Sequence, residues 1–463
     1  MWQVNDVIVI SDVHLSTKKG GAGKDGQELF QADEALGQFL TWVLREAADS
    51  LVVLNGDILD YLSISPGPEA KTAVTDFLHL PERTRAIVED HPAVFDALAR
   101  LAASPRHQIV FTAGNHDPEL IFPSVQQVIE KRLSNSASAP PLRWFVQGDA
   151  LALQVGAART IVEHGDVLDA WNRVDRSAMR SAVSLASRGL LSHHRYQAPP
   201  GSRLVLDCLI SLKQDYPWVE LLKPETSTVP HLLRYYLPKE RLPEFKDALF
   251  SYIQAAKNHL VVQLCEEVGP HELFMEAAGE LAGAESDSAL GHFRKLWNDL
   301  NRQATALRKN SLISRLRQAA VKDSFFDVAA ADAGTYKVLS FLVGNGADLL
   351  IHGHTHSAKA YKVAARAADG DKDGLYLNSG TWAQLMRLPA HDGGDDVWQQ
   401  FLDDLEGGEA RGFANGFQRL TFARVSSGRG QTTARLGEWK DGSPVELAAY
   451  AFAPERRTWE QES

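Results

Sequence analysis

Cysteine is scarce in this 463-residue chain, which contains only Cys208 and Cys265. The two residues lie far apart and form no Cys-x-x-Cys pattern, so neither a disulfide scaffold nor a thiolate zinc site is indicated. Two buried thiols in a reducing compartment are the simpler interpretation.

Long apolar runs are also missing. No stretch of about 18 apolar residues occurs, so we expect no membrane-spanning helix. Residues 1–6 contain neither a basic region nor an apolar core, and we therefore expect no signal peptide. The expected location is the cytoplasm.

Basic residues are fewer than acidic ones, with 48 Lys and Arg against 59 Asp and Glu, which gives a formal net charge of −11. This balance argues against non-specific binding of nucleic acid, although local basic patches can outweigh it. The hydrophobic share of 44% is that of an ordinary globular protein and excludes extended disorder as the main state. The length predicts about two or three domains.

The order of the apolar patterns divides the chain into three parts. Residues 1–166 alternate short β-branched runs with helix-period segments. From 167 to 335 helix-period segments dominate, including 245–268 and 289–321, and strand patterns return in 336–463. We predict one α/β (α+β) domain made of 1–166 and 336–463, interrupted by a helical insertion, 167–335, that acts as a cap.

The elements of the α/β part are predicted from their periodicity. Helices are expected at 33–48 and 76–103, the second broken near Pro92, and 391–412 is interpreted as a solvated loop or a short helix. Strands are expected at 7–10, 51–54, 109–112, 144–146, 151–155, 160–163, 348–351, 360–363, 374–377, 417–425 and 432–439.

Five of these strands run directly into residues of the types that bind metals, usually beside a glycine. They are Asp12, His14, Asp57, Asp60, Asn115, His116, Asp117, His164, Asp166, His354 and His356. The carboxyl ends of strands in an open α/β sheet face the functional crevice, so these side chains are expected to gather there. Within each Asp-x-His or His-x-His pair, an extended backbone would point both side chains to the same side. The glycines allow sharp turns and a close approach of the backbone to a ligand.

Each motif alone has an ordinary explanation. An Asp-x-His triplet occurs often by chance, a single buried histidine is usually hydrogen-bonded in a core, and Gly56-Asp57 is a common turn. Chance does not account for all five motifs, each of which follows directly after a strand. Carboxylates and imidazoles collected at one edge of a sheet can surround a cation. The set therefore predicts a metal site.

The ordered set Asp12-x-His14, Gly56-Asp57-x-x-Asp60, Gly114-Asn115-His116-Asp117, His164 and Gly353-His354-x-His356 resembles the calcineurin-like metallophosphoesterases. The resemblance covers about residues 4–166 and 346–390. It implies a four-layer fold in which two mixed sheets form a β-sandwich flanked by helices.

The resemblance also implies a role for each residue. Asp12, His14 and His356 would hold one metal, Asn115, His164 and His354 a second, and Asp57 would bridge the two. His116 would lie beside the scissile phosphate and stabilise the transition state or protonate the leaving oxygen. Asp60, Asp117 and Asp166 would be partners that orient the ligands.

This resemblance implies a hydrolase that cleaves a phosphodiester or pyrophosphate bond through attack of a hydroxide bridging two divalent ions. Nitrogen and hard oxygen ligands without thiolate suit Mn²⁺, Fe or Zn²⁺ and do not choose among them. Two other functions stay open. One is a nuclease acting on DNA or RNA, and the other is a non-catalytic scaffold on the same fold, which would be expected to have lost ligands.

Two features bear on the substrate. Position 61 is Tyr, where the Ser/Thr protein phosphatases typically carry Arg, which disfavours protein phosphatase activity. The His164-Gly165-Asp166 triplet with the later Gly353-His354-x-His356 is similar to the UDP-2,3-diacylglucosamine pyrophosphohydrolases, whose chains are much shorter. A phosphate-ester substrate linked to a nucleotide or a lipid is therefore expected.

The insertion contains two basic segments. Residues 173–203 hold six Arg and one Asp, and residues 289–322 hold eight Lys or Arg and one Asp, with an apolar helical stripe. The simpler interpretation is a helix packed by its apolar face, and the alternative is a basic rim that attracts an anionic lipid, a nucleotide or, peripherally, a membrane surface. Trp171, Asn172 and Arg173 are candidate substrate contacts, and 378–382 is interpreted as a structural turn.

Overall fold

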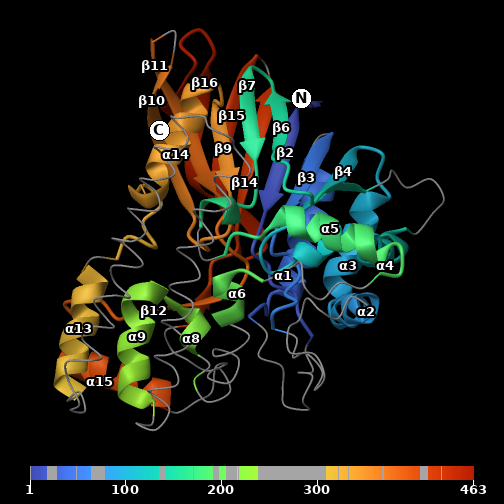
Figure 1. Cartoon of the computed structure of the whole chain (residues 1–463). Coiled ribbons are helices and arrows are strands. Elements are labelled where there is room, and N and C mark those ends of the chain that lie inside the picture. Colours follow the sequence, from blue (N-terminus) through green and yellow to red (C-terminus); the bar gives the residue numbers. More distant parts are fainter. Residues whose placement is uncertain are drawn as a thin grey trace. The chain divides into compact units, whose positions relative to one another are not determined.

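Figure 1 shows a computed structural model of the whole chain. It describes residues 2–17, 29–47, 49–63, 79–134, 142–169, 172–190, 198–204, 216, 218–237, 309–321, 323–331, 333–367, 370–406, 416–428 and 430–462.

The chain forms two compact units. Unit 1 consists of Met1–Ala198, Asp327–Ala383 and Arg419–Ser463, and unit 2 of Pro199–Phe326 and Gln384–Gln418. These limits differ from the predicted ones, because 167–198 and 327–335 belong to unit 1 and 384–418 belongs to unit 2. The reason for the first difference is helix α5 (Arg176–Ala186), whose Met179 is buried in the main core of unit 1 with Ala178 and Val183 packed against that core. The role of the insertion as a cap stays a prediction.

Unit 1 contains an eight-stranded sheet. Its four parallel strands are β2 (Asp6–Ile10), β3 (Ser50–Asn55), β4 (His107–Thr112) and β5 (Arg143–Phe145). Four antiparallel strands continue from β2 in the order β14 (Thr421–Gly428), β15 (Gln431–Lys440), β16 (Ser443–Ala453) and β17 (Thr458–Gln461).

A second, six-stranded sheet completes the β-structure of unit 1. Its order is β1 (Trp2–Val4), β6 (Leu151–Val155), β7 (Ala158–Val162), β9 (Leu349–His352), β11 (Gly370–Asn378) and β10 (Lys359–Ala367). Strands β7 and β9 are parallel neighbours with Val162 opposite Ile351, so chain segments from the first and last parts of the sequence end side by side. This pairing brings His164 next to the loop after β9.

Alternate side chains of each buried strand enter different cores. Val7 and Val9 of β2 pack with Leu153 and Ile351 of the second sheet, whereas Ile8 and Ile10 face the helices. Those helices are α1 (Asp33–Glu46), α2 (Leu80–Asp90), α3 (Pro92–Ala102) and α4 (Pro123–Leu133).

Among the described residues, helix α14 (Ala333–Gly344) covers the outer face of the second sheet. Leu339 and Val343 of this helix are buried against Leu350 and Tyr361. The order of layers is therefore helix, sheet, sheet, helix (Figure 1), and the predicted four-layer fold is confirmed.

The described residues of unit 2 form mainly helices, with a small sheet. Strand β12 (Gln384–Arg387) pairs with β8 (Leu222–Lys223) and β13 (Gly416–Gln418). The described helices are α6 (Pro200–Leu204), α8 (Trp218–Leu221), α9 (Glu225–Tyr236), α13 (Lys309–Val321) and α15 (Asp395–Glu406). The segment 391–412 thus contains a short helix, and the predicted helix 245–268 lies outside the described residues.

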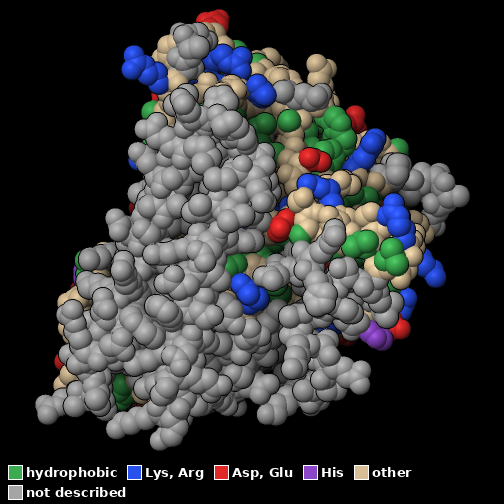
Figure 2. All heavy atoms as spheres, in the orientation of Figure 1, with side chains coloured by type: hydrophobic (Ala, Val, Ile, Leu, Met, Phe, Trp, Pro, Cys, Tyr) green, Lys and Arg blue, Asp and Glu red, His purple; other side chains and the backbone are tan. Residues whose placement is uncertain are grey.

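No described helix has the length and apolar character needed to cross a bilayer. In Figure 2, Lys and Arg side chains gather near the outer ends of β10 and β16. The large exposed hydrophobic side chains of the described residues come from four separate segments and are Leu190, Val321, Val397 and Val445.

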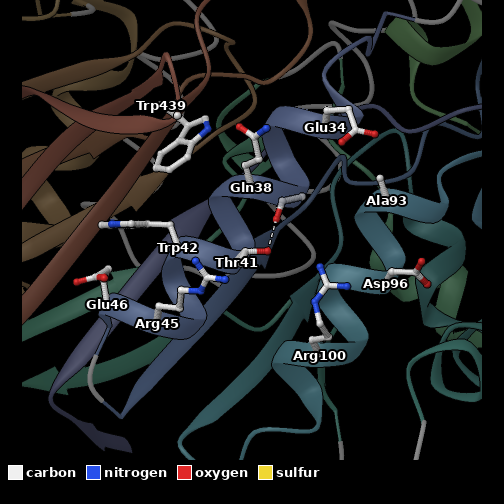
Figure 3. Close-up of a pocket in the computed structure, with 12 residues that line it drawn as sticks. Glu34, Gln38, Thr41, Trp42, Arg45, Glu46, Ala93, Asp96, Arg100 and Trp439 are labelled. Atoms are coloured by element: carbon white, nitrogen blue, oxygen red, sulfur yellow. Dashed lines mark hydrogen bonds between the residues drawn. The ribbon is translucent and has the colours of Figure 1, made fainter.

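A surface hollow of about 510 Å³ lies over α1 in unit 1 (Figure 3). Trp42 and Trp439 form one wall, and Arg45 and Arg100 reach it from α1 and α3. None of the residues that line it belongs to the predicted metal motifs. The candidate site is therefore elsewhere in the unit.

Candidate metal centre

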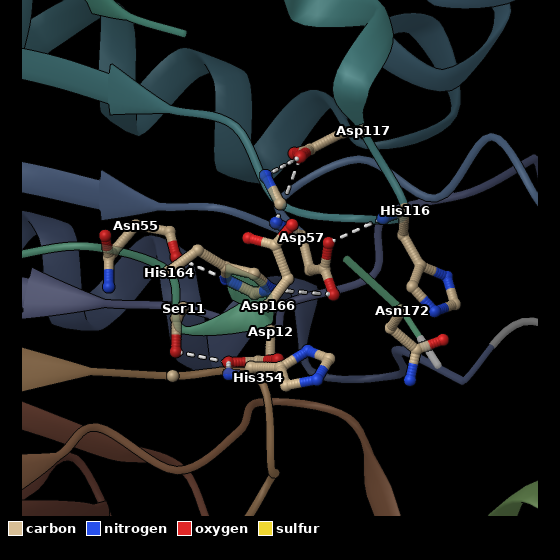
Figure 4. A network of polar contacts seen from close by, with 12 residues as sticks. Ser11, Asp12, Asn55, Asp57, His116, Asp117, His164, Asp166, Asn172 and His354 are labelled. Atoms are coloured by element: carbon tan, nitrogen blue, oxygen red, sulfur yellow. Dashed lines mark hydrogen bonds and ion pairs between the residues drawn. The ribbon is translucent and has the colours of Figure 1, made fainter. Parts of the chain in front are cut away.

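The predicted ligands meet where five strands of unit 1 end. The loops after β2, β3 and β4 come from the first sheet, and those after β7 and β9 come from the second. Figure 4 shows Asp57 lying between His164 and the loop that carries His116. Because the two sheets stack face to face, their carboxyl ends deliver both sets of side chains to one place.

The backbone that carries these side chains is left-handed, not extended as the spacing of two suggested. The φ angles are 52° at Asp12, 58° at His14, 51° at Asp57, 69° at His354 and 59° at His356. A positive φ in a residue other than glycine costs about 1–3 kcal/mol and persists where the surroundings enforce it. Here the loops hold one another, since the amide of His14 donates to the carbonyl of Asp57 at 2.9 Å.

Two glycines are required by this geometry. Gly56 has a φ of 74°, and a Cβ on it would lie 2.5 Å from Nδ1 of His164. A Cβ on Gly114 would lie 2.7 Å from the amide nitrogen of Asp57. The backbone therefore approaches the ligands as closely as predicted, and a larger residue at either position would displace them.

Asp12, His14 and His356 form the first group that could hold a metal ion. The Nε2 atoms of the two imidazoles lie 3.0 Å apart, and Oδ1 of Asp12 lies 3.4 Å from Nε2 of His356. The other oxygen of Asp12 accepts hydrogen bonds from Oγ of Ser11 and, at 2.9 Å, from the amide of His354. Oδ1 is thereby turned toward the two imidazoles.

Asp57, His164 and His354 form the second group. Nδ1 of His164 lies 2.9 Å from the carbonyl oxygen of Asn55 and donates to it, so in the neutral imidazole Nε2 carries the lone pair. That Nε2 lies 3.2 Å from Oδ2 of Asp57. A lone pair facing a carboxylate is repulsive unless a proton or a metal ion lies between them.

Unpaired buried atoms support the same interpretation. Within the described part of the chain, Oδ1 of Asp12, Oδ1 of Asn115 and Nε2 of His164 are buried without a hydrogen-bond partner. Such atoms are costly in an apolar interior, and oxygen and imidazole nitrogen are ligands of divalent cations. The residues present therefore fit a metal centre.

The ionisation of these groups reflects their mutual contacts. Burial works against a charge on Asp57, but His164 and His116 hold the pKa of its carboxyl well below the usual range. Burial alone would lower the pKa of His164, yet the negative charge of Asp57 at 3.2 Å raises it to about 10. Burial raises the pKa of Asp12, although His164 opposes this effect. The site thus requires positive charge near its carboxylates.

His116 lies beside the two groups and is held by Asp60. Its Nδ1 is 3.0 Å from Oδ1 of Asp60, and its ring lies edge-on to that of His14 at 4.6 Å between centroids. Asp60 is 1% exposed, and in spite of this burial the charge of His116 holds its carboxyl pKa well below the usual value. The pair is a histidine with a buried carboxylate behind it.

Asp117 and Asp166 accept hydrogen bonds from backbone amides and not from the side chains of the candidate ligands. Asp117 accepts hydrogen bonds from the amides of Asp57, Ile58, Leu59 and Gly114 at 2.7–3.2 Å. Burial, together with the charge of Asp57, raises its pKa to about 6.

Asp166 binds the amide of Val174 at 3.3 Å and Nη2 of Arg176 at 3.1 Å. The same guanidinium donates to the carbonyl of Ala113 at 2.9 Å, directly before the loop that carries Asn115. Asp166 and Arg176 therefore tie the segment after η3 (Asp166–Leu168) to the end of β4.

The candidate substrate contacts fall in different places. Nδ2 of Asn172 donates to Oδ2 of Asp169 at 2.7 Å, and Arg173 is buried. Trp171 lies outside the described residues. Asp169, which also contacts Nε2 of His354 at 2.9 Å, was missed from the sequence. Its position five residues after His164, in the same loop, was the available signal.

The segment 378–382 also contributes more than a turn. Oγ1 of Thr381 donates to the carbonyl of Asp12 at 2.7 Å, and Oγ of Ser379 lies 2.7 Å from Oγ of Ser11. Nδ2 of Asn378 donates to the carbonyl of Gly353 at 2.7 Å. These bonds fix the loops that carry Asp12 and His354.

The family model of the calcineurin-like phosphoesterases matches residues 6–228. The matched range includes every candidate ligand except His354 and His356. These two histidines follow β9, and the pairing of β9 with β7 brings them to the other ligands. The match covers 223 of the 463 residues, just under half of the chain. It indicates a metal-dependent hydrolase of phosphoester bonds, in agreement with the groups of His and Asp side chains that could hold metal ions. No curated protein matches the chain significantly.

Proposed function

We propose that the centre holds two divalent cations and that the chain hydrolyses a phosphodiester or pyrophosphate bond. Asp12, His14 and His356 would hold one ion, and Asn115, His164 and His354 the other, with Asp57 between them. The observation that carries the proposal is the convergence of Asp12, His14 and His356 beside Asp57, His164 and His354 with buried, unpaired ligand atoms.

When bound, the cations would neutralise the charge of the phosphate group and acidify the attacking water. The side chains of the protein supply the remaining chemistry. Nδ1 of His116 is engaged by Asp60 at 3.0 Å, so Nε2 is the nitrogen that would donate a proton to the leaving oxygen. The buried carboxylate of Asp60 would stabilise the imidazolium before that transfer.

The donor set is imidazole nitrogen with carboxylate and amide oxygen. This combination supports Mn²⁺, Fe or Zn²⁺, and Mn²⁺ is the ion we propose for the first assay. A scaffold without activity is disfavoured because every ligand position implied by the resemblance keeps a ligand-type residue.

The basic segments give little support to peripheral membrane contact. Lys309 pairs with Asp403 at 2.7 Å and Arg317 with Asp395 at 2.9 Å, so two of the three cations of α13 form ion pairs with α15. Arg176 is used inside unit 1. We propose a soluble phosphate ester, linked to a nucleotide or a lipid, as substrate, and the cytoplasmic location stays a prediction.

The test is hydrolysis of mono-, di- and pyrophosphate esters by the metal-free protein with added Mn²⁺. We expect metal-dependent cleavage of bis-p-nitrophenyl phosphate, loss of activity in Asp57→Ala, and loss of activity with retained metal in His116→Ala. Asp149→Ala and His79→Ala are matched controls, since both side chains are exposed. Single-stranded and duplex DNA test the nuclease alternative.

Undiminished turnover in Asp57→Ala or His116→Ala would remove this site from the reaction. Binding of less than one equivalent of metal by the wild-type chain, without activity, would favour the scaffold.

A further inference from the structure

Asp169 stands at the edge of the metal centre without a role in the function proposed above. It follows directly after η3, in the loop that begins with His164. Its Oδ2 lies 2.9 Å from Nε2 of His354, and the two side chains are 27% and 10% exposed. The contact joins two segments that are far apart in the sequence.

This contact determines which nitrogen of His354 carries the hydrogen. A carboxylate only accepts hydrogen bonds, so Nε2 donates to Asp169. In a neutral imidazole the other nitrogen, Nδ1, then holds the lone pair. Nδ1 is therefore the atom of His354 that is suited to a cation.

His164 follows the same rule with its nitrogens exchanged. Its Nδ1 donates to the carbonyl oxygen of Asn55 at 2.9 Å, and its Nε2 faces Asp57. Each imidazole of the second group is thus held through one nitrogen, Nδ1 in His164 and Nε2 in His354, and its other nitrogen would be available to an ion. Acceptors behind metal-binding histidines fix the tautomer and ring orientation in this way.

The position of Asp169 is itself fixed. Nδ2 of Asn172 donates to the same Oδ2 at 2.7 Å, and the amide of Arg173 donates to the carbonyl of Asp169 at 2.9 Å. The amide of Asp169 in turn donates to the carbonyl of Asp166 at 3.0 Å. These bonds hold the carboxylate of Asp169 in place beside the imidazole of His354.

We propose that Asp169 is a positioning residue that orients His354 and selects Nδ1 as its metal-binding atom, with Asn172 holding Asp169 in place. The proposal rests on the proposed function, since it assigns a role toward the second ion. It also gives Asn172 a role other than the expected substrate contact.

The test measures the affinity of the metal-free chain for Zn²⁺ by competition with a chromophoric chelator, which resolves a first and a second ion. We expect Asp169→Ala to weaken one of the two ions by about 10- to 100-fold and to leave the other unchanged. Asp169→Asn keeps an acceptor oxygen and should recover part of the affinity. Asn172→Ala should give a smaller loss in the same ion.

Asp175→Asn is the matched control, because Asp175 lies in the same segment but only caps α5 by accepting from the amide of Ala178 at 2.8 Å. A second readout is the tautomer of His354, from nitrogen NMR of the Zn²⁺ form labelled at histidine and assigned with His354→Ala. We expect a proton on Nε2 in the wild type and loss of that signature in Asp169→Ala.

The outcomes separate the two proposals. If the wild-type chain binds fewer than two ions, the proposed function fails. If it binds two ions and Asp169→Ala and Asp169→Asn bind both with unchanged affinity, the role of Asp169 is overturned. A proton on Nδ1 of His354 in the wild type would overturn it as well. If Asp169→Ala does not fold, the metal affinities of Asp169→Asn and Asn172→Ala decide whether Asp169 has this role.

Discussion

His14 and His356 face each other through their Nε2 atoms at 3.0 Å, with Oδ1 of the buried Asp12 only 3.4 Å from the second imidazole. Two bare lone pairs at this distance repel each other, and the carboxylate adds to the repulsion. A proton or a metal ion must therefore lie among these atoms. The same holds for His164 and Asp57, which lie 3.2 Å apart.

Competition between protons and metal is the first consequence. Asp57 raises the pKa of His164 to about 10, so this imidazole is protonated at neutral pH in the metal-free chain. A cation must expel that proton, and metal affinity should therefore rise with pH, by about tenfold per pH unit for each proton released. Calorimetry of Mn²⁺ binding at pH 7 in buffers of different ionisation enthalpy measures the number of protons. A release of zero protons would contradict the prediction.

The contact of Asp60 with His116 supports a second prediction. Asp60→Asn keeps the shape of the side chain but removes the charge 3.0 Å from Nδ1 of His116. We expect kcat to fall by about 10- to 100-fold while bound metal is retained, because the imidazolium loses its stabilising partner.

Steady-state kinetics and metal analysis of the same sample check the role of Asp60. Ser63→Ala is the control, since it removes only a hydroxyl that donates to Oδ2 of Asp60 at 2.5 Å. A normal kcat in Asp60→Asn would separate Asp60 from the reaction.

Much of the fold follows from local patterns. The apolar run at 7–10 is central to β2, and the break near Pro92 separates α2 from α3. Strand β16 was missed because its first four residues, 443–446, are all exposed and include Ser443, Pro444 and Glu446, so no apolar alternation marks its start. The boundary of unit 2 was missed because 384–418 joins it through pairing of β12 with β8, which is a long-range contact.

In the candidate site too, the features set by local sequence were predicted and those set by long-range contacts were missed. The ligand types were visible because each follows a strand directly, so local order and one rule about strand ends were enough. Asp169 was missed because its partner His354 is 185 residues away, and its place five residues after His164 was the only local signal. The left-handed backbone at Asp12 and His14 was also hidden, because it arises from bonds between loops.

Asp117 is expected to be essential for stability. Its carboxylate accepts four backbone hydrogen bonds at 2.7–3.2 Å, which hold the loops after β3 and β4 together. Asp117→Ala leaves these buried amides without an acceptor, so we expect a loss of about 3–5 kcal/mol in the free energy of unfolding. Denaturant unfolding of the metal-free chain measures it.

The exposed Asp149→Ala is the comparison for Asp117→Ala. A loss below about 1 kcal/mol would show that the loops are held by other contacts.

Glu119 leads to a prediction about pH. Its side chain is 1% exposed, and among the described residues its Oε2 has no hydrogen-bond partner. Burial raises its pKa from 4.5 to about 8, with a further contribution from Asp117. The folded state therefore binds more protons than the unfolded state between these values, and stability falls as pH rises through that window.

Glu119→Gln stays neutral at every pH and so lacks this loss. Relative to the wild type, the variant should gain stability from pH 4.5 to about 8 and then level off, by a total on the order of a few kcal/mol. Urea unfolding at pH 5 and pH 9 measures the difference, and Glu82→Gln, an exposed carboxylate at 70% exposure, is the control. Equal effects of Glu119→Gln at both pH values would mean that the buried carboxyl is already charged in the folded chain at pH 5.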